Sequence, residues 1–391
     1  MVFKINSKDF LKALKDARAN ISPRRNYPIM DYQSYWLSVV FSYDVLEVST
    51  VSRGGNLLTV NVPIQVVNSD KAPKSKVMVS QRLYGIVKTM DSQDLTIDLT
   101  ADKMEIQHAC GVVRFPTLTG SNIVVCGPLK FGHDRMIFLS TCDADELRLI
   151  LSTLKPFMGD DEFRPVMKGI CVKYTDEYTD YVASDGHRLC RISLPRKGCP
   201  DEILIPDTVV SVIQKVLPKT GKVSIYYKRD DLTTQIEAGN IRYIFKQTEG
   251  LYPNYQKVIP DDGDVIITLE RQKLVRCLNR MTAIDHNKID HNKYLSVHMS
   301  VDLDHISFST DGQDGGDIGL DERVPILDRT SLGEFSAYIA PHGMLKSVSK
   351  LQSDLIMVSL KSSCYAPVVI HSEAPFRYGG DITVLIMPII K

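Results

Sequence analysis

The order of predicted elements, which recurs three times along the chain, constrains the fold more than any other feature of the sequence. Each third contains a helix, a set of strands, a second helix and further strands, at a spacing of roughly 130 residues. The first helices are predicted to begin at Ser7, Asp143 and Glu270, and the second helices at Ser80, Pro206 and Ala340. The letters differ between the copies, so the repeat lies in the order of elements. We therefore expect three related domains, at 1–132, 133–262 and 263–391.

Alternating apolar and polar residues mark the predicted strands, as in LTIDLT and VSIYYK. This period of two, together with two helices per domain, predicts antiparallel sheets that carry helices on one face. The expected fold class is therefore α+β. Three such units could form an arc, and two arcs with free sheet edges could close into a ring.

Charge and cysteine content exclude several classes of protein. The chain carries 47 Lys and Arg against 47 Asp and Glu, so it is not a simple polycation that coats nucleic acid. Residues 1–132 carry 16 basic and 11 acidic side chains, so an anionic partner would be drawn to selected faces. The eight cysteines include no CxxC pair, and we expect them to be reduced, with no metal site and no cofactor. The absence of a long apolar run and of a secretory signal predicts a cytoplasmic protein.

Basic side chains recur at helical spacing on the polar faces of the predicted helices. The first helix carries Lys8, Lys12 and Lys15 on one stripe. On the later helices, the candidates for contacts with a phosphate backbone are Arg148, Lys155, Lys215, Lys273, Arg276 and Arg280. Such contacts would be independent of base sequence and sensitive to salt. Each stripe taken alone also fits an ordinary solvated helix face, and that alternative stays open.

Two other classes of function remain as alternatives. A hydrolase could use the turn Asp185-Gly186-His187, but no third group and no GxSxG, HExxH or Walker-type loop accompanies it. The acidic run STDGQDGGD lacks the spacing of a calcium loop. A non-ring scaffold associated with DNA is the second alternative. A repressor is disfavoured, because no predicted helix begins with a cluster of base-reading side chains.

Five motifs together resemble those of one family of DNA replication proteins. They are YVASDGHRLCRISLP, EGLYPNYQKVIP, the C-terminal VLIMPIIK, RPVMKGICVKY and RRNYPIM. In combination, and with the order of elements over the whole chain, they resemble the bacterial β sliding clamp, the processivity subunit of DNA polymerase III. The resemblance would also fit a divergent or phage-borne homologue.

The resemblance implies a function without catalysis. It implies a head-to-tail homodimeric ring, with strands outside and helices inside, that encircles duplex DNA and tethers the replicative polymerase for processive synthesis. It also implies a cleft between the second and third domains that receives short hydrophobic peptides of the polymerase and the clamp loader. Neither a cofactor nor a membrane is implied.

Carried over position by position, the resemblance assigns residues to three roles. The peptide cleft would consist of Met167, Ser184, Gly186, His187, Arg188, Leu189, Pro253, Lys257, Val258, Leu385, Met387, Pro388 and Ile389. Arg24, Arg82 and Arg164 match basic positions that contact DNA. Phe115 and Ile284 match positions at the ring interface.

Three of these assignments keep an alternative. Phe115 could be an ordinary core residue, and the residues before Met387 could form an edge strand of the last sheet. The Asp185–His187 segment could be a tight hairpin with a positive φ at Gly186. The chain departs from the family at Lys257, where Arg is frequent, and at its end, where Ile390 and Lys391 replace the usual pattern. These departures leave the preferred peptide sequence open.

Overall fold

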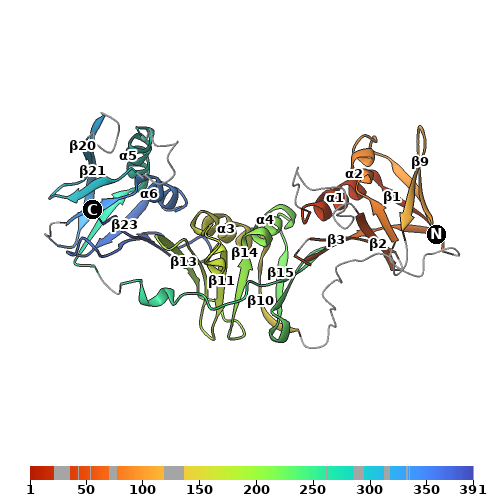
Figure 1. Ribbon diagram of the computed structural model, residues 1–391, viewed down its shortest axis with the longest axis horizontal. Coiled ribbons are helices and arrows are strands. Elements are labelled where there is room, and N and C mark those ends of the chain that lie inside the picture. Colours follow the sequence, from red (N-terminus) through yellow and green to blue (C-terminus); the bar gives the residue numbers. More distant parts are fainter. Residues whose placement is uncertain are drawn as a thin grey trace. The chain divides into compact units, whose positions relative to one another are not determined.

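The computed structural model describes two compact units, each built on one antiparallel sheet (Figure 1). The first unit comprises Met1–Arg148 with Ser211–Gln247, and the second comprises Leu149–Val210 with Thr248–Lys391. The residues not described are 22–35, 43, 53, 70–76, 119–135, 261–262, 285–294, 312–317, 332, 334 and 391, and only the backbone is described at 36–42 and 311. Arg24 and Lys391 therefore lie outside the described residues.

The first unit holds a 13-stranded sheet in the order β10-β15-β16-β17-β4-β3-β2-β6-β9-β8-β7-β1-β5. The strands are β1 (Val2–Asn6), β2 (Trp36–Ser42), β3 (Val45–Val51), β4 (Leu57–Pro63), β5 (Gln65–Asn68), β6 (Val77–Ser80), β7 (Asp94–Leu99), β8 (Lys103–His108), β9 (Gly111–Leu118), β10 (Ile137–Asp143), β15 (Lys222–Lys228), β16 (Thr233–Ala238) and β17 (Ile241–Lys246). Helices α1 (Ser7–Arg18) and α2 (Arg82–Val87) pack against each other (Figure 1), and η4 (Arg229–Asp231) is a 3₁₀ turn.

Helix α1 shows why the first element of the repeat forms where the sequence predicts it. The side-chain oxygen of Asn6 accepts a hydrogen bond from the backbone N–H of Lys8 at 3.0 Å and so caps the first turn. Phe10, Leu14 and Ala17 are buried at helical spacing, and the helix packs on β3 and β4. Burying a side chain such as Phe10 or Leu14 contributes about 1.5–3 kcal/mol, so this packing stabilises the helix more than its cap does.

The second unit holds a 12-stranded sheet in the order β14-β11-β12-β13-β25-β24-β23-β18-β21-β20-β19-β22. The strands are β11 (Gly169–Tyr174), β12 (Thr179–Ser184), β13 (Arg188–Leu194), β14 (Asp201–Pro206), β18 (Val265–Glu270), β19 (Val297–Val301), β20 (His305–Asp311), β21 (Gly319–Arg329), β22 (Phe335–Ile339), β23 (Leu355–Leu360), β24 (Val368–Ser372) and β25 (Asp381–Ile386). Helices α5 (Arg271–Ala283) and α6 (Pro341–Val348) pack together, and η2 (Lys155–Phe157), η3 (Pro165–Lys168) and η5 (Tyr255–Lys257) are 3₁₀ turns.

The predicted repeat and the α+β class are confirmed. The central helices are α3 (Ala144–Leu154) and α4 (Asp207–Val216), and the division between the units passes through both. The strands of the central third are therefore shared: β10 and β15–β17 belong to the first unit, and β11–β14 to the second. The domain boundaries at 132/133 and 262/263 stay a prediction.

The C-terminal strand corrects one expectation. Strand β25 lies between β13 and β24, so the alternative of an edge strand before Met387 is wrong. Residues Ile382–Ile386 are all buried, which is typical of a strand covered on both faces and not of a sheet edge. Through β25, the last segment of the chain joins a sheet begun by strands of the central third.

Candidate partner-binding surface

The hairpin that joins β12 to β13 has a fixed backbone shape. The Asp185 carboxylate accepts hydrogen bonds from the backbone N–H groups of His187, at 3.0 Å, and Arg188, at 2.7 Å. Gly186 has a φ of +92°, in the region that favours glycine, so the predicted tight hairpin is confirmed. A Cβ at Gly186 would also lie 2.9 Å from a guanidinium nitrogen of Arg164, so this side chain lies against the turn.

Arg188 ties this turn to two other elements. Its Nη2 lies 2.6 Å from Asp185 Oδ2 and donates to the Pro156 carbonyl in η2 at 3.0 Å. Its Nη1 lies 3.5 Å from the Gly343 carbonyl in α6, and its guanidinium carbon is 5.6 Å from the Phe157 ring centroid. Only 14% of the Arg188 side chain is exposed. The guanidinium therefore acts as a structural link, with its charge balanced by Asp185.

An apolar cluster adjoins the turn. Leu189 and Leu385 are directly opposed on β13 and β25, and they pack with Tyr252 and Tyr255. Met167 is buried as well, and its carbonyl accepts from Gly159 N–H at 2.9 Å. Of the thirteen residues predicted for the cleft, Leu189 and Leu385 are therefore members of this cluster, and Met167 is buried in the 3₁₀ turn η3.

The C-terminal tail is held by its backbone on two sides. Met387 N–H donates to the His187 carbonyl at 2.8 Å, and Ile389 N–H donates to the Tyr338 carbonyl of β22 at 2.7 Å. The Met387 side chain is 38% exposed and that of Ile390 is 74% exposed. The main chain of the tail is therefore part of the fold, while these apolar side chains remain available to a partner.

A connector, defined here as residues 248–260, links β17 to the last third and contains η5. It carries Pro253, Lys257 and Val258, which are all exposed. Tyr255 of the same segment is buried, and its hydroxyl donates to Asp180 Oδ2 at 2.8 Å. The connector therefore combines exposed predicted partner residues with a buried anchor.

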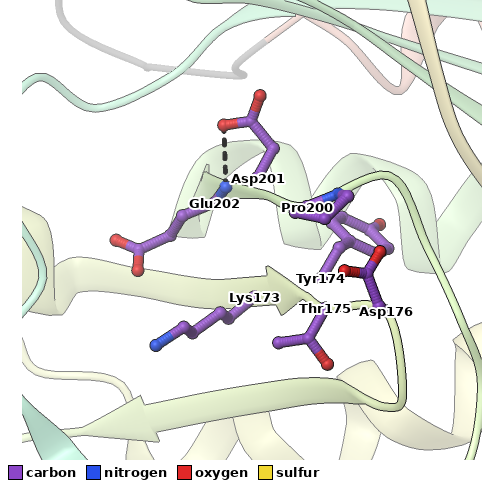
Figure 2. Close-up of a pocket in the computed structure, with 7 residues that line it drawn as sticks. All are labelled: Lys173, Tyr174, Thr175, Asp176, Pro200, Asp201 and Glu202. Carbon is purple, nitrogen blue, oxygen red and sulfur yellow. Dashed lines mark hydrogen bonds between the residues drawn. The ribbon is translucent and has the colours of Figure 1, made fainter.

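A hollow of about 380 Å³ lies at the end of β11 remote from Gly169 (Figure 2). It is lined by Lys173, Tyr174, Thr175, Asp176, Pro200, Asp201 and Glu202. Burial raises the pKa of Glu202, against the lowering effects of Lys173 and of the Tyr252 backbone N–H. These residues were not predicted as a site. Over the described part of the chain, no three His, Cys, Asp or Glu side chains gather so as to hold a metal ion.

Four of the predicted DNA-contacting side chains are engaged by other groups. Arg148 donates to the carbonyls of Gln214, Leu217 and Pro218 and so caps the carboxyl end of α4. Lys273 pairs with Glu270 at 2.7 Å, Arg164 pairs with Asp161 at 2.9 Å, and Arg280 donates to both carboxylate oxygens of Glu322. The hydrogen bond from the Arg280 guanidinium is the main reason why the pKa of Glu322 is lowered.

The remaining predicted cations, Arg82, Lys155, Lys215 and Arg276, are exposed. Phe115 was predicted either for the ring interface or for the core. It is only 6% exposed and belongs to the core of the first unit. Ile284 is half-buried and follows the last turn of α5.

The turn is poorly suited to catalysis. The Asp185 carboxylate already receives two backbone N–H groups and the Arg188 guanidinium, so it is not available to orient the His187 imidazole as a base. Among the described helices, none is long and apolar enough to cross a membrane.

Sequence reasoning missed several residues that build this surface. Tyr255, Tyr338, Pro156 and Gly343 contact predicted site residues, and Asp180 accepts a hydrogen bond from Tyr255, yet these contacts join segments far apart in the chain. The strand TDYVAS contained one signal: a single charged residue, Asp180, stands in a strand that is otherwise uncharged, and it needs a partner if it is buried.

Known proteins resemble this chain in both sequence and structure. A family model described as DNA polymerase III beta subunit, central domain, matches residues 141–254. The β sliding clamps of Pseudomonas aeruginosa and Caulobacter vibrioides are each 23% identical to it, over 74% and 71% of this chain and 76% and 73% of theirs.

Solved structures match the whole chain, among them two from Pseudomonas aeruginosa and Streptococcus pyogenes. The crystal structure of the DNA polymerase sliding clamp from Pseudomonas aeruginosa with ligand matches with a TM-score of 0.84 at 16% identity. The beta subunit from DNA polymerase of Streptococcus pyogenes matches with a TM-score of 0.83 at 14% identity. Each covers 100% of both chains, and at these identities the likeness shows the fold. The matched family model includes the turn at Gly186 and the start of the connector. The chain therefore has the fold of the DNA polymerase III β sliding clamps, and its residues 141–254 match the central domain of that subunit.

Proposed function

We propose that this protein is a DNA sliding clamp, a non-catalytic factor that makes DNA replication processive. In this proposal two chains close head to tail into a ring around duplex DNA in the cytoplasm. The ring tethers the replicative polymerase and is opened by a clamp loader. The observation that carries the proposal is that the turn, the connector and the tail, which are far apart in the sequence, meet at one apolar cluster.

The chemistry of this surface favours short hydrophobic peptides as partners. Exposed Val258 lies in the connector, which the buried Tyr255 side chain anchors to the cluster, and exposed Met387 lies in the tail, whose backbone bonds to the turn. Each Leu-sized side chain that a partner buries there would contribute about 1.5–3 kcal/mol. Two or three such anchors are enough for micromolar affinity after the entropic cost of binding. Lys257 offers a flexible point charge to the peptide, where an Arg would offer a planar fork.

Retention on DNA is proposed to depend on enclosure more than on strong contacts. Because the ring would hold on by enclosure, individual phosphate contacts can stay weak and sliding fast, which agrees with the formal net charge of zero. Exposed Arg82, Lys155, Lys215 and Arg276 are the proposed contacts, with Arg24 and Arg164 added from the family pattern. Ile284 is proposed for the ring interface, and Phe115 supports it from within the core.

The proposed DNA contacts are tested by the salt dependence of binding to a short duplex. The logarithm of the association constant falls linearly with the logarithm of the salt concentration. Replacing Arg276 with Ser should make this slope less steep by about 0.9, the value for one lost phosphate contact. Replacing Arg148 with Met should leave the slope unchanged, because its guanidinium is bonded to the end of α4. Fluorescence anisotropy over a series of KCl concentrations measures both. Equal slopes for the parent and the Arg276 variant would remove this residue from the DNA contacts.

A further inference from the structure

Asp180 is a buried carboxylate that the proposed function has not used. It lies on β12, and its side chain has no exposed surface. Its Oδ2 accepts the hydroxyl of Tyr255 at 2.8 Å and lies 2.9 Å from Nε of Arg191. Its Oδ1 has no hydrogen-bond partner among the described residues. Burying a carboxylate with so few partners destabilises the fold. The hydrogen bond from Tyr255 is one of the few contacts that offset this cost.

Tyr255 connects this carboxylate to the connector. Its ring packs in the same cluster as Leu189 and Leu385, and its carbonyl accepts from Val258 N–H at 3.2 Å. Burial, and after it the Asp180 charge, raise the pKa of Tyr255, so the phenol stays protonated and donates. One hydroxyl therefore fixes the 3₁₀ turn that carries Lys257 and precedes Val258.

The surroundings of Asp180 support the same segment from a second side. Gln256 of the connector donates to the Tyr178 hydroxyl at 3.4 Å, and the Arg191 guanidinium lies 5.9 Å from the Tyr178 ring centroid. Apart from η5, the connector has no helix or strand of its own between 248 and 260. Its exposed partner residues therefore depend on side-chain anchors for a defined position.

We propose that Asp180 is a positioning residue of the partner surface: through the Tyr255 hydroxyl it holds Pro253, Lys257 and Val258 where a hydrophobic peptide packs on them. The inference rests on the proposed function, since it assumes that peptides bind there. It assigns a role in partner affinity to two residues that themselves are buried and do not touch the peptide.

The test compares two variants that each remove one buried tyrosine hydroxyl. Tyr255→Phe removes the bond to Asp180. Tyr243→Phe is the matched control, because its hydroxyl donates to Asn20 at 3.1 Å in the first unit. The probe is a fluorescein-labelled six-residue peptide with two leucines and one phenylalanine. Tyr255→Phe should bind it about tenfold more weakly, the ratio expected for one lost buried hydrogen bond, whereas Tyr243→Phe should bind it like the parent.

Two further readouts separate positioning from general stability. Asp180→Asn keeps an oxygen that accepts from Tyr255, so its peptide affinity should stay within about twofold of the parent even though Arg191 loses its counter-charge. The Val258 amide should exchange its hydrogen faster in Tyr255→Phe and not in Tyr243→Phe. Unchanged affinity in Tyr255→Phe, or an equal loss in both tyrosine variants, would overturn the inference. A parent protein that does not bind the peptide would instead count against the proposed partner surface.

Discussion

Replacing Arg188 with Ala is expected to destabilise the protein by about 3 kcal/mol and to abolish partner binding. The change leaves the partly buried Asp185 carboxylate without its cation, and it removes the donor to the Pro156 carbonyl. The turn at Gly186 and the first residues of β13 would lose their link to η2 and α6. Equilibrium urea unfolding followed by circular dichroism measures the change in the free energy of unfolding.

Arg114→Ala is the matched control for this substitution. Arg114 pairs with Glu105 at 2.8 Å, but its side chain is 67% exposed. An exposed pair of this kind contributes at most about 1 kcal/mol, because water and salt screen it. If the two arginine variants lost the same stability, Arg188 would not be the link described here.

Replacing Met387 with Lys is expected to abolish stimulation of the polymerase while the fold is retained. The substitution places a charge on the apolar surface, and desolvating it costs about 2 kcal/mol or more, so peptide affinity should fall by more than about tenfold. The fold should persist because the bond from the Met387 N–H to the His187 carbonyl involves only the backbone. Primer extension in the presence of the clamp loader measures the stimulation.

Val67→Lys is the control for this second prediction. Val67 is 58% exposed on the edge strand β5 of the first unit, so the same change of chemistry occurs on a different sheet from that of the tail. This variant should stimulate the polymerase as the parent does. Loss of stimulation in both variants would point to a general effect of an added charge.

The local elements were predictable because their causes are local. Helix α1 begins at Ser7 as expected, since Asn6 can cap it and the spacing of Phe10 and Leu14 defines a buried face. The α+β class followed from the period of two in the strands. The placement of β25 was not predictable in this way, because nothing in VLIMPIIK identifies the strands on either side of it.

The site was predictable in part, and there is a physical reason why some of its residues could be predicted and others could not. The resemblance located the turn, the connector and the tail, which the structure brings to one cluster. It could not show that Arg148 is held by carbonyls near Leu217, or that Arg280 is held by Glu322, because these partners lie on other elements. A basic stripe at helical spacing identifies an exposed face, and only the fold shows which of its charges are already paired. The strand TDYVAS indicated that Asp180 needs a buried partner, and only the fold shows that this partner is Tyr255.

The most direct test of the account is the retention of the loaded protein on circular and on linear DNA. The protein is first loaded by its clamp loader on a nicked circular plasmid, and free protein is removed by gel filtration. The unloaded protein should have the mass of a dimer of the 43.9 kDa chain. Enclosure predicts that the protein stays on the circle and is released when a restriction enzyme opens it. Equal retention on the circular and the linearised DNA would show that the protein binds by contacts alone, and would contradict the account.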